Sequence, residues 1–137
     1  MFSRQRLFWS RDPYDLEGTQ ERFVQAVADN CAWHMGRCPE YRAIAQGLGF
    51  SPKTLVETGD LSAVPMVPTL FFKRHAPFSM PKWRMGMKVT SSGTSGTFSQ
   101  VGFDLGCIWA EVPMVLRLGW RHRLISFRPA NYVVLGY

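Results

Sequence analysis

Apolar residues recur at helical spacing in the segment 17–37. They stand three to four positions apart, which places them on one side of a helix. The set consists of Phe23, Val24, Val27, Ala28 and Cys31. The preceding residues 1–15 lack such a period, and we expect them to form a mobile lead-in.

Proline and glycine punctuate two further short helices. Pro39 suits the first position of a helix that stops at Gly47 or Gly49. The segment 51–59 repeats this arrangement, with a serine as N-cap, a proline in the first turn and a glycine as terminator. Residues 1–60 are therefore predicted to be a helical segment with short loops.

The pattern changes at residue 61. Four prolines within 61–81 bar a continuous helix and favour an extended, irregular connector. Residues 83–90 and 99–104 each alternate loosely in polarity and flank a glycine-rich stretch, which is typical of a β-hairpin.

Asp104 is placed to cap a helix over 105–120, which Pro113 would kink or split. The composition of 131–137 predicts a terminal strand. The pattern as a whole predicts an α/β fold, or a mixed α+β fold. Its helical N-terminal segment (1–60) would precede a partial nucleotide-binding α/β subdomain (61–137), and the two would form one incomplete domain.

Composition supports a globular protein and reveals an uneven charge. The chain has 137 residues, of which 46% are hydrophobic, enough for one ordinary domain. Residues 1–60 carry seven Lys/Arg and eight Asp/Glu, whereas 61–137 carry nine Lys/Arg and only Asp104 and Glu111. A net charge of +7 in the second part (nine minus two) indicates either an anionic partner or a solvated basic face.

The number of cysteines and the length of the apolar runs indicate the cellular compartment. The three cysteines, Cys31, Cys38 and Cys107, are too few and too scattered for a disulfide scaffold and favour a reducing environment. The apolar run near the N-terminus is too short for a signal peptide, and no stretch is long enough for a membrane span. We therefore expect a soluble, cytoplasmic protein.

Glycines and hydroxyl residues dominate the stretch between the two predicted strands. Gly93 and Gly96 permit positive φ angles and a close backbone approach, so that successive N–H groups can form an anion-binding nest. The hydroxyls of this loop come from Ser91, Ser92, Thr94, Ser95 and Thr97. The loop suits the oxygens of a polyphosphate, and the alternative is a flexible polar turn. It matches neither the Walker nor the dinucleotide-binding pattern.

This loop resembles a known signature. "TSSGTSGTFSQVGFD" is similar to the phosphate-binding loop of the acyl-adenylate-forming superfamily, with a residue-by-residue match through 91–96. Thr97 and Phe98 replace the Pro-Lys pair of many members, as they do in the acyl-protein synthetases of bacterial luciferase operons. "DLSAVPMVPTLFFKRH" resembles the proline-rich approach of that same family. The resemblance covers about residues 40–137.

The resemblance implies an enzyme that activates a fatty acid with ATP as an acyl-adenylate and passes the acyl group to a protein thiol. The loop 91–97 would hold the β- and γ-phosphates together with Mg²⁺, and no catalytic residue is assigned. The motif aromatic-Gly-x-Thr-Glu is absent after Thr97, and no acidic residue follows Glu111. We therefore expect a fragment of the large N-terminal domain of an adenylate-forming enzyme, with little or no activity alone.

Two alternatives of other classes stay open. One is a non-catalytic module that binds phosphate, a nucleotide or a partner chain. The other is a basic nucleic-acid-binding domain, which the cluster of Arg121, His122, Arg123 and Arg128 beside two aromatics suggests. That cluster completes no nucleic-acid motif, so we rank this class last. A second basic cluster, at 73–75, would help to neutralise a nucleotide or form a solvated edge.

Two cysteine arrangements are weighed and not assigned. Cys31, His34 and Cys38 stand at i, i+3 and i+7, and these residue types bind zinc. Pro39 predicts that the helix ends near residue 37, which displaces the last of them, and no fourth ligand lies nearby. We predict no metal site. Cys107 lies in a predicted apolar helix, which favours packing over a role as acyl acceptor.

Overall fold

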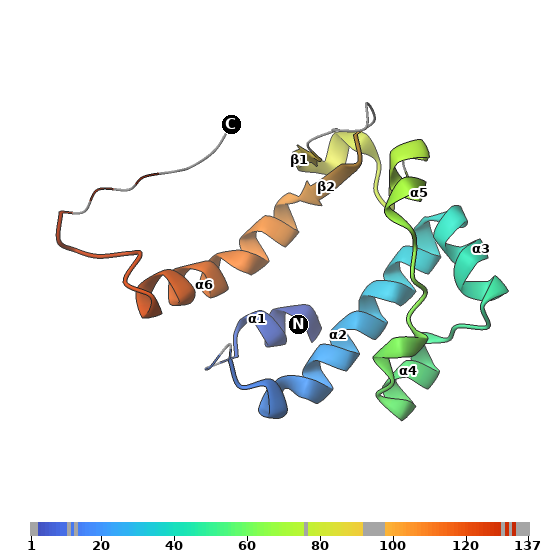
Figure 1. The fold of residues 1–137 in the computed structure, drawn as a ribbon, viewed down its shortest axis with the longest axis horizontal. Helices are drawn as coiled ribbons and strands as arrows, with labels where there is room; N and C mark the ends of the chain where they lie inside the picture. The colour runs from blue at the N-terminus through green and yellow to red at the C-terminus, as the bar shows by residue number, and fades with distance from the viewer. Residues whose placement is uncertain are drawn as a thin grey trace.

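A computed structural model describes residues 3–10, 12, 14–75, 77–91, 98–129, 131 and 133. Within these residues the protein is mostly helical, with one antiparallel hairpin (Figure 1). The long helix α2 runs through the molecule. The short helices α3 and α4 lie on one side of it, and α6 lies on the other, beyond α1.

The three N-terminal helices of the sequence prediction are confirmed. They are α2 (Leu16–Arg37), α3 (Pro39–Gly47) and α4 (Pro52–Thr58). Local capping explains their limits. The Asp15 carboxylate accepts from the Gly18 N–H at 2.9 Å, and the Ser51 hydroxyl accepts from the Thr54 N–H at 3.5 Å. Gly59 ends α4 with φ 69°, a left-handed conformation that glycine adopts without a steric penalty.

The buried core lies among these three helices. It consists of Val24, Ala28, Cys31, Ala45, Phe50 and Leu55, with the partly buried Leu61 and Val64 packed against it. Every fully buried member of this cluster falls within residues 24–55. The helical layer α2–α4 is therefore the best-packed part of the described molecule.

The N-terminal residues correct the sequence prediction. The expected mobile lead-in is wrong for the described part, because α1 (Ser3–Phe8) packs between α2 and α6. The Arg117 guanidinium on α6 donates to the backbone carbonyls of Phe8 and Ser10. Contacts between residues more than a hundred positions apart thus hold α1 in place. No local hydrophobic period predicts such contacts.

Short helical turns interrupt the proline-rich connector. They are η1 (Leu61–Ala63), α5 (Thr69–Arg74) and η2 (Lys82–Arg84). The prolines lie outside these turns or at their first flank, so the prediction of a connector without a continuous helix is confirmed.

The predicted hairpin is confirmed with its register. β1 (Met85–Thr90) pairs antiparallel with β2 (Gln100–Asp104), and Val89 faces Val101. Asp104 ends β2 and also caps α6 (Leu105–Arg121), where its carboxylate accepts from the Cys107 N–H at 2.6 Å. Pro113 does not split this helix, which continues to Arg121.

The predicted α/β class holds only in coarse form. The described fold is helical with a two-stranded antiparallel sheet, which is closer to the mixed α+β alternative. The strand predicted over 131–137 falls largely outside the described residues, and the two described positions in it are not in a strand.

Candidate functional site

The hairpin positions the glycine-rich loop of the sequence analysis. The Ser91 N–H donates to the Ser99 carbonyl at 3.1 Å, and the Ser91 hydroxyl accepts from the Ser99 N–H at 3.0 Å. These two hydrogen bonds continue the ladder beyond Thr90 and Gln100 and close the base of the loop.

The loop itself lies outside the described residues. Of the seven candidate phosphate ligands, Ser92, Gly93, Thr94, Ser95, Gly96 and Thr97 fall in that segment, and only Ser91 is placed. The Ser91 amide is engaged by the partner strand, so this residue anchors the loop and does not offer a free N–H to an anion. The role of the other six stays a prediction.

The surroundings of the hairpin are basic. Lys82 and Arg84 lie in η2 just before β1, and Lys88 is exposed within β1. From residue 77 to the end of β2, the described residues include a single carboxylate, Asp104, at the end of the hairpin away from the loop. Of these cations only Lys88 lies within the paired strands, whereas Lys82 and Arg84 lie at the end of the hairpin away from the loop.

A hollow of mixed polarity lies at the end of the hairpin opposite the loop. It has a volume of about 460 Å³ and is lined by Arg37, Arg84, Trp33 and Asp104, among others. The Arg37 guanidinium stacks over the Trp33 ring at 4.7 Å. Because β1 and β2 separate this hollow from the loop, the two do not form one site.

The C-terminal basic cluster is partly used inside the molecule. Arg121 forms an ion pair with Asp12 at 3.4 Å and lies over the Tyr14 ring at 5.2 Å, and His122 hydrogen-bonds the Tyr14 hydroxyl. These contacts hold the N-terminal segment against the C-terminal end of α6. The other basic cluster, Lys73, Arg74 and His75, ends α5, and its His75 ring lies 4.8 Å from that of Phe71.

The cysteines and histidine weighed as zinc ligands have separate partners. The Tyr41 hydroxyl donates to the Cys31 sulfur at 3.3 Å, His34 Nδ1 lies 2.6 Å from the Ser79 hydroxyl, and Cys38 donates to Glu40 at 3.4 Å. In the part of the chain that the structure describes, no three such side chains gather to hold a metal. Burial raises the pKa of the Cys38 thiol and lowers the pKa of His34.

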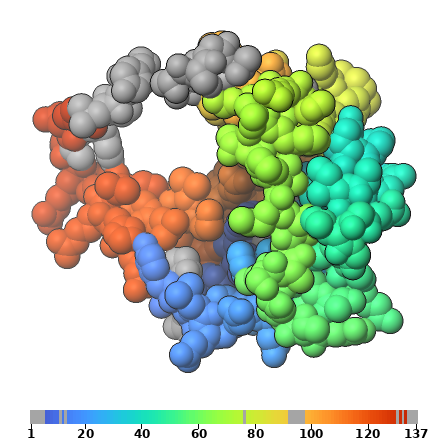
Figure 2. Space-filling view, turned by 45° about the vertical axis from the view of Figure 1, so that its right-hand side comes forward, coloured from blue at the N-terminus to red at the C-terminus, as the bar shows by residue number. Residues whose placement is uncertain are grey.

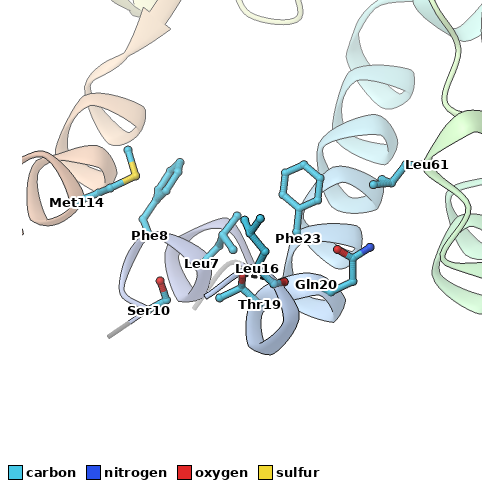
Figure 3. A pocket seen from close by; sticks show the side chains of 9 residues that line it. All are labelled: Leu7, Phe8, Ser10, Leu16, Thr19, Gln20, Phe23, Leu61 and Met114. Carbon is cyan, nitrogen blue, oxygen red and sulfur yellow. Dashed lines mark hydrogen bonds between the residues drawn. The ribbon is translucent and has the colours of Figure 1, made fainter. Parts of the chain in front are cut away.

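An apolar pocket lies between α1, α2 and α6 (Figure 3). Its volume is about 370 Å³, within the range of roughly 300–1,000 Å³ of small-molecule pockets. Phe8, Leu16 and Phe23 point into it from the N-terminal helices, and Met114 faces it from α6. This pocket could not be predicted from the sequence, because one of its walls, α1, comes from the segment predicted to be mobile.

Comparisons with known proteins give one family. The family model described as "Acyl-protein synthetase, LuxE" matches residues 2–114 of the 137-residue chain. The searches of curated proteins and of solved structures returned no match. The matched range includes the whole candidate loop and most of α6. No helix among the described residues is both long and apolar enough to cross a membrane.

Proposed function

Since the chain belongs to the LuxE family of acyl-protein synthetases, we propose that it contributes the phosphate-binding loop to the ATP-dependent activation of a fatty acid. The family match over residues 2–114 is the observation that carries this proposal. The exposed Lys88 on β1 supports it, because a polyphosphate needs positive charge around it.

The proposed reaction has two steps. A carboxylate oxygen of the acid attacks the α-phosphorus of ATP, and the bond to the bridging oxygen breaks, which releases pyrophosphate and leaves an acyl-adenylate. A thiolate then attacks the acyl carbon, and AMP leaves. The residues 91–97 act in the first step, where they hold and neutralise the β- and γ-phosphates as pyrophosphate departs.

Mg²⁺ and the acyl acceptor come from outside the described residues. Since these gather no carboxylate cluster, the ion is proposed to arrive on the phosphates of ATP, where it would neutralise part of their charge. Cys31 and Cys38 are buried, and the pKa of Cys38 is raised, so neither thiol is poised as a nucleophile. We therefore assign the acceptor thiol to another protein.

The reducing cytoplasm is the proposed compartment. All three cysteines are free thiols, in agreement with that assignment.

ATP binding by the full chain tests the role of the loop. Isothermal titration should detect binding, and Gly93→Val or Gly96→Val should weaken it by at least about tenfold, or 1.4 kcal/mol, because a branched side chain blocks the backbone approach. Gly36→Val is the matched control, since Gly36 lies in α2 with open space around it. Equal affinity in all four proteins would refute the phosphate-binding role.

Acid-dependent exchange of pyrophosphate into ATP then separates two functions. Exchange by this chain supports a complete adenylating enzyme. ATP binding without exchange supports the alternative of a non-catalytic nucleotide-binding module.

A further inference from the structure

Helix α6 carries an apolar stripe that the described molecule leaves largely exposed, with one ring contact at its end, between Trp120 and Phe127 at 5.5 Å. Its members recur at i, i+4, i+7, i+11 and i+15, which is the spacing of a helix face that packs on another element. They are Leu105, Trp109, Val112, Leu116 and Trp120, and we call them the α6 stripe. Its two leucines and two tryptophans are 54 to 72% exposed.

Other residues of α6 face the N-terminal helices: Ala110 is buried, Met114 faces the apolar pocket, and Arg117 holds α1. Gly119 is covered by Ile125, and Val115 is 56% exposed outside the stripe. The stripe is therefore distinct from the face that packs on the N-terminal helices. Figure 2 shows that α6 (orange) lies on the opposite side of the molecule from α3 to α5 (cyan to green), so the α2–α4 core does not cover it.

The exposed area is large enough for a stable interface. Side chains of these sizes at these exposures leave on the order of 600 Å² of mostly apolar surface, which reaches the upper size of the largest patch on a typical monomer. Two such stripes together bury about 1,200 Å², the lower limit of specific and stable interfaces.

The order of residues makes the stripe complementary to itself. When two copies of α6 lie antiparallel about a twofold axis near Val112 and Pro113, Leu105 of one copy faces Trp120 of the other, and Trp109 faces Leu116. Each large ring then meets a smaller side chain, as close packing requires. A parallel pair would set each tryptophan against its own copy.

Charge favours the same orientation. The basic residues Arg121 to Arg123 follow the stripe directly. In a parallel pair the two clusters would adjoin and repel, whereas an antiparallel pair separates them by the length of the stripe, about 24 Å at 1.5 Å per residue. Antiparallel helix dipoles also attract.

From these observations we infer that the chain forms a twofold dimer in solution through antiparallel packing of its α6 stripes. This inference does not depend on the proposed enzymatic function.

Sedimentation equilibrium of the full chain over a range of concentrations tests the dimer. We expect twice the mass of one chain, falling to a single mass on dilution. Trp109→Glu should make the protein monomeric, and Trp109→Ala should weaken association at least about tenfold without adding a charge. Trp83→Glu is the matched control, because Trp83 is 83% exposed and lies outside the stripe. It should leave the dimer intact.

A mixing experiment tests the orientation. Trp109→Glu and Leu116→Lys should each be monomeric alone and should form a one-to-one heterodimer when combined, since the two new charges face each other only in the antiparallel pair. Circular dichroism checks that both variants keep their helices. A wild-type chain that stays monomeric at every concentration overturns the inference. Equal dissociation by Trp83→Glu, or a monomer that uses the stripe to bind anionic vesicles, overturns it too.

Discussion

At the scale of single residues, Arg117 has the clearest structural role. Its guanidinium on α6 donates to the carbonyls of Phe8, Ser10 and Pro113. Charge-assisted hydrogen bonds of this kind satisfy carbonyls that a short helix leaves without partners. The residue thus joins the first and last helices of the described molecule.

We predict that Arg117→Met releases the N-terminal segment. Methionine keeps much of the apolar stem but removes every donor, so the free energy of unfolding should fall by about 1–3 kcal/mol. Chymotrypsin should cut near Phe8 and Trp9 faster than in the wild type. Arg74→Met, at an exposed arginine that ends α5, is the control. Equal cleavage of both variants would show that Arg117 does not hold α1.

The sequence could not assign these residues. From the sequence, Arg121 and His122 were interpreted as part of a basic cluster that suggests nucleic-acid binding. In the structure they contact Asp12 and Tyr14, more than a hundred positions away. Ser91 was predicted to offer its hydroxyl to phosphate, and in the structure that hydroxyl accepts from the Ser99 N–H across the hairpin. For Arg121 and His122 the partners are distant in sequence, and a local pattern carries no information about them.

At the scale of elements, local chemistry explains most of the successful predictions. Pro39, Ser51, Gly59 and Asp104 limit helices through bonds or dihedral angles within four residues, so their signals are visible in the sequence. Pro113 was harder to interpret. Proline removes one backbone donor, but packing and the remaining hydrogen bonds keep α6 helical on both sides of it.

Two glycine substitutions should have opposite effects on stability. Gly59→Ala places a Cβ in a left-handed conformation and should destabilise the protein by about 1–2 kcal/mol. Gly47→Ala, at the last helical residue of α3 with open space around it, should stabilise by up to about 1 kcal/mol. Urea unfolding measures both. A gain in stability from Gly59→Ala would show that α4 does not end in the described conformation.

At the scale of the whole molecule, packing is uneven. The fully buried cluster lies in α2–α4, while α6 and the hairpin expose Trp109, Trp120, Val89 and Val101. The sequence predicts that α6 is an apolar helix, but composition alone does not show whether an apolar face is covered by the same chain or by a second one. The coverage depends on the arrangement of elements far apart in sequence.

This unevenness predicts the order of hydrogen exchange. In dilute solution the amides of α2 to α4 should exchange slowest, because opening them exposes the buried core around Leu55, whereas α6 should exchange faster. At higher concentration α6 should slow and α2 to α4 should not change, since a second copy covers only the α6 stripe. Mass-spectrometric exchange on both the wild type and Trp109→Glu measures this, and the variant should lose the concentration dependence. If α6 were as protected as α2 in the dilute wild type, its stability would come from within one chain, and the stripe would need no partner to explain its order.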